Sequence, residues 1–112
     1  MKLEYSEPAE AQTDEIAERL SARYGPQISG RFLDGLTAAL EREIAFVQIG
    51  RRPLARESQA TRRDLYAVVA RGGGSWRVLY ELRDDDRDGA LDTMLVVSVV
   101  SATGPDAPAG SG

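Results

Sequence analysis

The sequence predicts an α+β fold in which a helical hairpin packs on one face of a small, mainly antiparallel sheet. Two stretches with helical periodicity follow each other in the first half of the chain, separated by Gly25-Pro26. Apolar segments of strand length fill the second half, after a short alternating segment at the start of the chain. These observations give the order β-α-α-β-β-β.

Residues 2–6 form the first expected strand, because polar and apolar side chains alternate there. Ser6 then suits the N-cap of a helix that runs to Tyr24, since its hydroxyl can accept a hydrogen bond from a first-turn amide. Pro8 is tolerated in that turn, where amides have no intrahelical acceptor. The expected apolar side consists of residues at helical spacing: Ala9, Thr13, Ile16, Ala17, Leu20 and Tyr24.

A second helix is expected from Gln27 to Val47, with a broad apolar stripe along it. Gly35 inside this helix costs roughly 1 kcal/mol relative to Ala, so we expect it where the two helices approach closely. Two amphipathic helices joined by a Gly-Pro turn indicate an antiparallel hairpin. The stripe comprises Phe32, Leu33, Leu36, Ala39, Leu40, Ile44 and Val47.

Residues 50–61 lose this periodicity and are expected to form an Arg-rich loop. Residues 65–70 and 76–83 then form a hairpin around the glycines at 72–74. On the second of these strands, Trp76, Val78, Tyr80 and Leu82 are expected to face the core, with Arg77 on the opposite face. Residues 92–102 are nearly continuously apolar, which predicts a central strand buried on both faces.

The 112 residues are enough for a single domain, which we place at residues 1–103. Residues 104–112 are rich in Gly, Pro and Ser and are expected to form a disordered tail. No apolar run approaches the roughly 18–20 residues that a membrane span needs. We therefore expect a cytoplasmic protein with no membrane association.

The chain contains neither Cys nor His. Thiol nucleophiles, disulfides, imidazole acid–base chemistry and Ser-His-Asp triads are thereby excluded. The acidic run at residues 84–88 lacks the ligand spacing of a calcium loop. The glycines at 72–74 lead into a strand, whereas a phosphate cradle leads into a helix. We therefore expect no cofactor and no metal.

The charge is distributed unevenly along a chain whose net charge is −4. Residues 49–83 contain eight arginines and three acidic residues, a balance of +5, between two acidic segments. Because the Arg guanidinium binds carboxylates and phosphates through a planar fork, this segment suits an acidic protein segment or a nucleic acid. The alternative is a solvated face whose arginines pair with acids of the same chain.

Several motifs, in this order along residues 2–103, resemble the RelE/ParE superfamily of toxins from bacterial type II toxin–antitoxin modules. The strongest is the strand Trp76-Arg77-Val78-Leu79-Tyr80-Glu81-Leu82. Gly50-Arg51 matches the Gly-Arg that follows the helical hairpin in this family. The other matching stretches are Tyr5-Ser6-Glu7-Pro8-Ala9, Tyr24-Gly25 and Arg31-Phe32-Leu33-Asp34-Gly35-Leu36.

The resemblance implies a toxin that is neutralised by a cognate antitoxin with an acidic or amphipathic segment. RelE-like members cleave mRNA on the ribosome with clustered cations, whereas ParE-like members bind and poison DNA gyrase. Ala67 and Val69 stand where the nucleases place lysines, and residues 101–103 have no cation where those enzymes have Arg or His. The resemblance therefore favours the ParE-like branch, with growth inhibition and plasmid stabilisation as the implied roles.

We expect the partner-binding residues to be Arg51, Arg52, Arg62, Arg63, Arg71 and Arg77. No catalytic residue is assigned in this interpretation. The alternative is a ribosome-dependent mRNA endonuclease with a non-standard site of Arg77, Arg71, Arg63 and Tyr66, which would bind RNA. A third interpretation is a non-toxic relative that only binds its partner.

Overall fold

The computed structural model describes residues 1–50 and 52–102. Its strands follow the order β1-β4-β3-β2, with β1 parallel to β4 and the other neighbours antiparallel. The predicted α+β fold is confirmed, whereas the tail expected at residues 104–112 lies outside the described residues. The elements are β1 (Lys2–Tyr5), α1 (Glu7–Tyr24), α2 (Pro26–Ile49), α3 (Glu57–Thr61), β2 (Tyr66–Arg71), β3 (Ser75–Arg83) and β4 (Thr93–Ser101).

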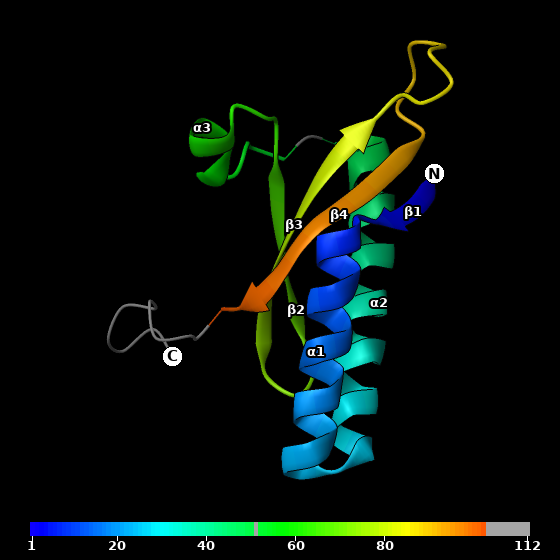
Figure 1. Ribbon diagram of the computed structural model, residues 1–112. Coiled ribbons are helices and arrows are strands. Elements are labelled where there is room, and N and C mark those ends of the chain that lie inside the picture. Colours follow the sequence, from blue (N-terminus) through cyan, green and yellow to red (C-terminus); the bar gives the residue numbers. More distant parts are fainter. Residues whose placement is uncertain (51, 103–112) are drawn as a thin grey trace.

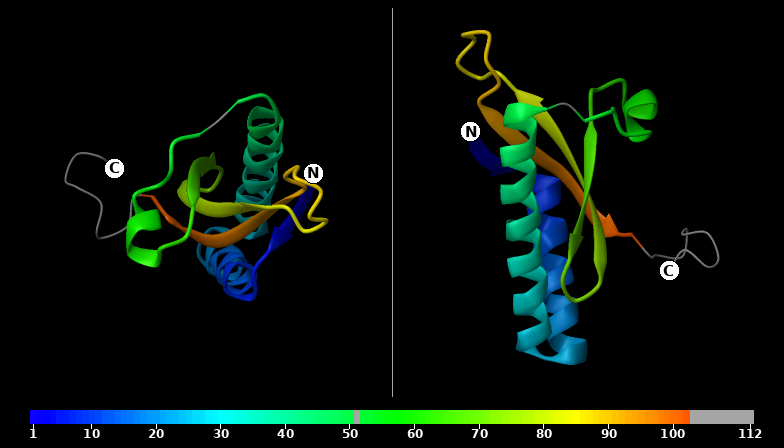
Figure 2. Two further views of the ribbon diagram at one scale, coloured as in Figure 1. Left: turned by 90° about the horizontal axis from the view of Figure 1, so that it is seen from above. Right: turned by 180° about the vertical axis from the view of Figure 1, so that it is seen from behind.

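The two long helices lie antiparallel, side by side, and cover one face of the sheet (Figure 1). We call this the inner face. The short helix α3 lies on the opposite side of the strands, on the outer face, as the view from behind shows (Figure 2). Among residues 1–50 and 52–102, no helix is long and apolar enough to cross a membrane.

The helical hairpin begins and turns where the sequence predicts. The Ser6 hydroxyl accepts a hydrogen bond from the Ala9 amide at 3.2 Å and caps α1. Gly25, with φ of +97°, ends α1 and precedes Pro26 of α2. Tyr24 and Leu33 were expected on the apolar sides, but both are exposed. Tyr24 lies at the turn of the hairpin, and Leu33 is rotated by about 100° from the buried Phe32.

The expected role of Gly35 in helix–helix contact is wrong, because Gly35 faces the β2–β3 turn instead. A Cβ atom at Gly35 would lie 2.0 Å from the carbonyl oxygen of Arg71. A Cβ atom at Gly72 would in turn lie 2.2 Å from the carbonyl oxygen of Arg31. Two glycines therefore allow α2 and the β2–β3 turn to pack backbone against backbone.

The core lies between the inner face and the two long helices. Trp76 is buried, as predicted, and its ring packs edge-to-face on Phe32 with the centroids 4.9 Å apart. Tyr80 is fully buried and stacks on Tyr66. Aromatic pairs of this kind add to the stability that burial of their area provides. The main buried side chains are Ala9, Ile16, Leu20, Phe32, Leu36, Leu40, Trp76, Val78, Tyr80, Met94, Val96 and Val99.

The outer face differs from expectation in two respects. The segment predicted as a loop contains α3, because Ser58 fastens it by hydrogen bonds to both the amide and the carbonyl of Leu65. A small cluster of Ala55, Leu65 and Leu79 then packs on this face. The prediction that β4 is buried on both faces is wrong at the end of the strand, where Val100 is exposed. The α3 segment covers only part of the outer face and does not reach this residue.

Candidate functional site

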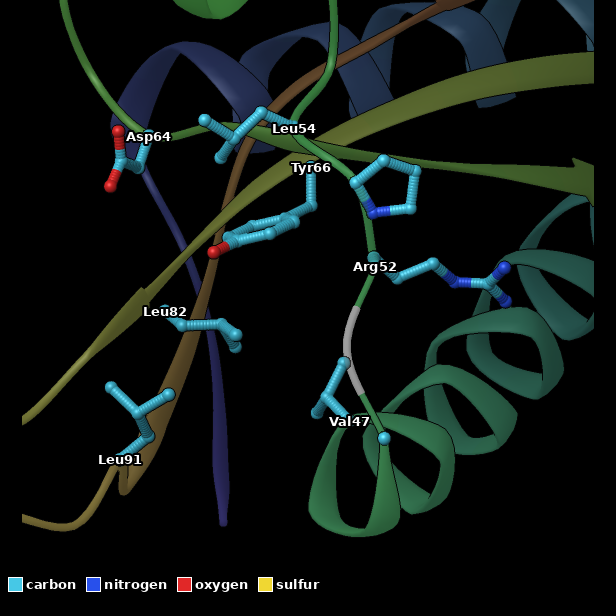
Figure 3. Close-up of a pocket in the computed structure, with 9 residues that line it drawn as sticks. Val47, Arg52, Leu54, Asp64, Tyr66, Leu82 and Leu91 are labelled. Carbon is cyan, nitrogen blue, oxygen red and sulfur yellow. The ribbon is translucent and has the colours of Figure 1, made fainter.

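A cleft of about 570 Å³ lies where the end of α2 meets β2, β3 and their flanking loops (Figure 3). Val47, Tyr66 and Leu82 are half-buried in it. Leu54 and Leu91, which also line it, are 52% and 53% exposed. We call it the apolar cleft. Exposed apolar side chains gathered around a hollow are typical of a surface that a protein partner covers.

One wall of the apolar cleft is held by a buried carboxylate on α2. Glu43 is 2% exposed and accepts hydrogen bonds from Arg52 Nε at 2.9 Å, Arg52 Nη2 at 3.0 Å and the Tyr80 hydroxyl. The Arg52 guanidinium also lies over the Phe46 ring, 4.1 Å from its centroid. In Figure 3 its side chain extends along α2. Arg52 therefore fastens the chain that leaves α2 and shapes this wall.

The same network changes the acidity of its members. The hydrogen bond to Glu43 raises the pKa of Arg52 above its ordinary value. Burial, and then the hydrogen bond to Glu43, raise the pKa of Tyr80 far above the ordinary value of a tyrosine. Arg52 therefore stays charged and Tyr80 stays protonated, so that both keep donating to the buried carboxylate.

The outer face of β3 contacts residues 55–65, which we call the strap. Arg77 donates two hydrogen bonds to Glu57, from Nε at 3.0 Å and from Nη2 at 2.9 Å. This bidentate contact lowers the pKa of Glu57 and raises that of Arg77. Arg63 of the strap forms a second ion pair with Glu81 of β3.

The predicted partner-binding arginines do not form one cluster. Arg52 lies at the apolar cleft, Arg62 and Arg63 lie on the strap, and Arg71 and Arg77 lie on the outer face of the sheet. Arg51 lies outside the described residues. Three of them form ion pairs with acids of the same chain: Arg52, Arg63 and Arg77. This is the alternative that the sequence left open.

The residues of the alternative nuclease site lie on two faces of the sheet. In the β2–β3 register, Tyr66 lies opposite Tyr80, on the inner face, where their rings stack. Arg77 lies opposite Val69 and belongs to the outer face. The sheet therefore separates Tyr66 from the arginines with which it would have to act.

The acidic run forms the turn between β3 and β4. Asp84 accepts hydrogen bonds from the amides of Asp88 and Gly89, and Asp92 accepts them from the amides of Asp85 and Asp86. The Thr93 hydroxyl, followed by these amides, lowers the pKa of Asp92 to about 2. Within the part of the chain that the structure describes, no group of three potential metal ligands is present.

Comparison with known families decides the assignment. A family model described as "ParE toxin of type II toxin-antitoxin system, parDE" matches residues 3–101. The chain belongs to the ParE toxin family. This finding confirms the resemblance to the RelE/ParE superfamily that the motifs indicated. No curated protein matches the chain significantly.

The sequence prediction missed several features of this ParE family member. Glu43 lies on the same side of α2 as Leu36, Leu40 and Val47, so a charge within an apolar stripe was the available signal. Glu57 gave no comparable signal, because it is one acid in an Arg-rich segment. The apolar cleft could not be found either, since its lining residues come from four separate segments.

Proposed function

We propose that this chain is a toxin that acts by binding a protein target, DNA gyrase, and is neutralised by a cognate antitoxin. The observation that supports this most is the apolar cleft, with Leu54 and Leu91 exposed at it. An amphipathic protein segment would bury these side chains and gain the free energy of removing them from water. Its location in the cytoplasm and a role in plasmid stabilisation stay predictions.

The outer face also favours binding over phosphate chemistry. A site that cleaves RNA needs cations directed at the phosphate as charge develops there. Here the guanidinium groups of Arg63 and Arg77 face carboxylates of the same chain. Both would have to exchange a carboxylate for the phosphate before they could stabilise a transition state.

Pulse labelling after induced expression without antitoxin tests the proposal. Thymidine and methionine incorporation are followed separately. We expect thymidine incorporation to fall first while translation continues, because gyrase poisoning blocks replication. If methionine incorporation falls first, an mRNA endonuclease replaces this proposal, and its site does not combine Tyr66 with Arg63, Arg71 and Arg77, because the sheet separates them. If neither falls, the chain is a non-toxic relative that only binds its partner.

Substitutions at the apolar cleft test where the target binds. Leu54→Glu and Leu91→Glu each place a charge where an apolar contact is proposed, and each should weaken inhibition about tenfold, equivalent to about 1.4 kcal/mol. Leu33→Glu is the matched control, because Leu33 is also exposed but lies near the other end of α2. Equal effects of all three substitutions would show that the cleft is not the binding surface.

A further inference from the structure

The strap and β3 are complementary residue by residue. Successive outward residues of β3 are Arg77, Leu79 and Glu81. Arg77 pairs with Glu57 of the strap and Glu81 pairs with Arg63 of the strap. Between the two ion pairs, Leu79 packs against apolar residues at the two ends of the strap, Ala55 and Leu65. Each of these three residues of β3 therefore faces a group of matching chemistry on the strap: an acid for Arg77, apolar side chains for Leu79 and a base for Glu81.

The two ion pairs that fasten the strap to β3 are partly accessible to water. The side chains of Arg77 and Glu57 are 27% and 28% exposed, and the Arg63 side chain is about half exposed. Ion pairs in such positions contribute little net stability, since water competes for both partners. The apolar contact between them is a small cluster, separate from the main core.

Hydrogen bonds between its own residues also hold the strap together. The Ala55 amide donates to the Leu65 carbonyl at 2.7 Å, and the Ser58 hydroxyl bonds to both the amide and the carbonyl of Leu65. These hydrogen bonds lie within residues 55–65 and do not involve β3. Displacement of the strap from β3 would therefore not by itself break these hydrogen bonds.

We propose that Arg77 anchors a binding site for an acidic protein segment, and that Glu57 occupies this site in the free chain until the partner displaces the strap. Glu57 shows which chemistry the site accepts: a carboxylate that receives both N–H groups of the guanidinium fork. A partner segment with an acidic and an apolar residue side by side would supply the same kinds of group, since the strap presents Glu57 to Arg77 and apolar side chains to Leu79. Only the identification of this partner with the antitoxin rests on the proposed function.

An acidic peptide provides the test, because no identified antitoxin is needed. Acetylated hexaglutamate is titrated into the full chain while the backbone amides of β3 are followed by NMR. We expect Glu57→Gln to bind the peptide about tenfold more tightly than the wild type, since the internal competitor is lost. Glu41→Gln is the control, because it removes the same charge from an exposed position on α2. Adding Arg77→Gln to Glu57→Gln should abolish the gain.

Equal gains in Glu57→Gln and Glu41→Gln would overturn the proposal, because net charge alone would then explain the binding. A gain that survives Arg77→Gln would overturn it as well. If Glu57→Gln disturbs the strap, Glu57→Asp keeps the charge on a shorter side chain, and an intermediate affinity is then expected. The titration does not depend on toxicity, so its failure and that of the labelling experiment are distinguishable.

Discussion

The two faces of β3 use charged groups in opposite ways. On the inner face, Trp76, Val78 and Tyr80 are buried, and the nearby carboxylate of Glu43 is closed off from water. On the outer face, Arg77 and Glu81 form ion pairs that water can reach. Because side chains alternate along a strand, one nine-residue element supplies both surfaces. The comparison indicates that the inner face determines stability and that the outer face remains available for exchange.

The physical basis of this difference is desolvation. Removing one member of a buried charged network leaves the other groups without partners and without water. Removing one member of an exposed pair leaves a group that water solvates again. Substitutions on the two faces should therefore differ strongly in their effect on the free energy of unfolding.

Glu43→Ala should have the largest effect. It leaves the fully buried Tyr80 hydroxyl without its acceptor and removes both hydrogen bonds of Arg52, whose side chain is 40% exposed and can be solvated by water. The free energy of unfolding should fall by about 2–4 kcal/mol. Urea denaturation measures this. Glu41→Ala, at an exposed position of the same helix, should change it by less than about 0.5 kcal/mol. A similar small loss in both variants would show that the inner network does not stabilise the fold.

Gly35→Ala tests the contact between α2 and the β2–β3 turn. The new methyl group would collide with the Arg71 carbonyl, so the free energy of unfolding should fall by about 1–3 kcal/mol. Gly30→Ala is the matched control in the same helix, because nothing lies within 4 Å of a Cβ atom there. It should raise the free energy of unfolding by about 0.5–1 kcal/mol. Stabilisation by both substitutions would contradict the observed packing.

The inner face was largely predictable from the sequence, and the outer face was not. Helical spacing in α1 and α2 and alternation in β3 placed most core residues correctly, because burial imposes a period on the sequence. The partner of Gly35 and the fold of the strap depend on contacts between distant segments, which have no period. Arg77 was found as a candidate residue, but its pairing with Glu57 spans twenty residues and left no local pattern.

The outer face should contribute less to the free energy of unfolding than the inner face, and acidification should remove that contribution. Because Arg77 lowers the pKa of Glu57 below its ordinary value of 4.5, ionised Glu57 stabilises the folded chain above that pH. This contribution is lost as the pH falls through the folded-state pKa. Glu57→Gln should therefore cost less than about 1 kcal/mol at neutral pH, and the difference from the wild type should vanish in acid. A difference that grows in acid would contradict this sign.

The turn between β3 and β4 should give the smallest effect. In the wild type, Asp92 keeps its amide hydrogen bonds down to a pH near its pKa of about 2, well below the ordinary 3.8. Asp92→Asn removes the charge, so amide exchange at Asp85 and Asp86 should become faster at neutral pH. In the wild type, exchange at these amides should change as the pH falls toward the pKa of Asp92, and in Asp92→Asn this pH dependence should be absent. Unchanged exchange, measured by NMR, would show that the carboxylate does not order the turn.

The central claim is that this ParE family member works by binding a protein. The most direct test adds the purified chain to purified DNA gyrase and measures DNA supercoiling, with Leu91→Glu as the comparison. The proposal predicts that the wild type inhibits supercoiling and that Leu91→Glu inhibits it about tenfold less. Uninhibited supercoiling, together with mRNA cleavage when the same preparation is added to a translating extract, would contradict it.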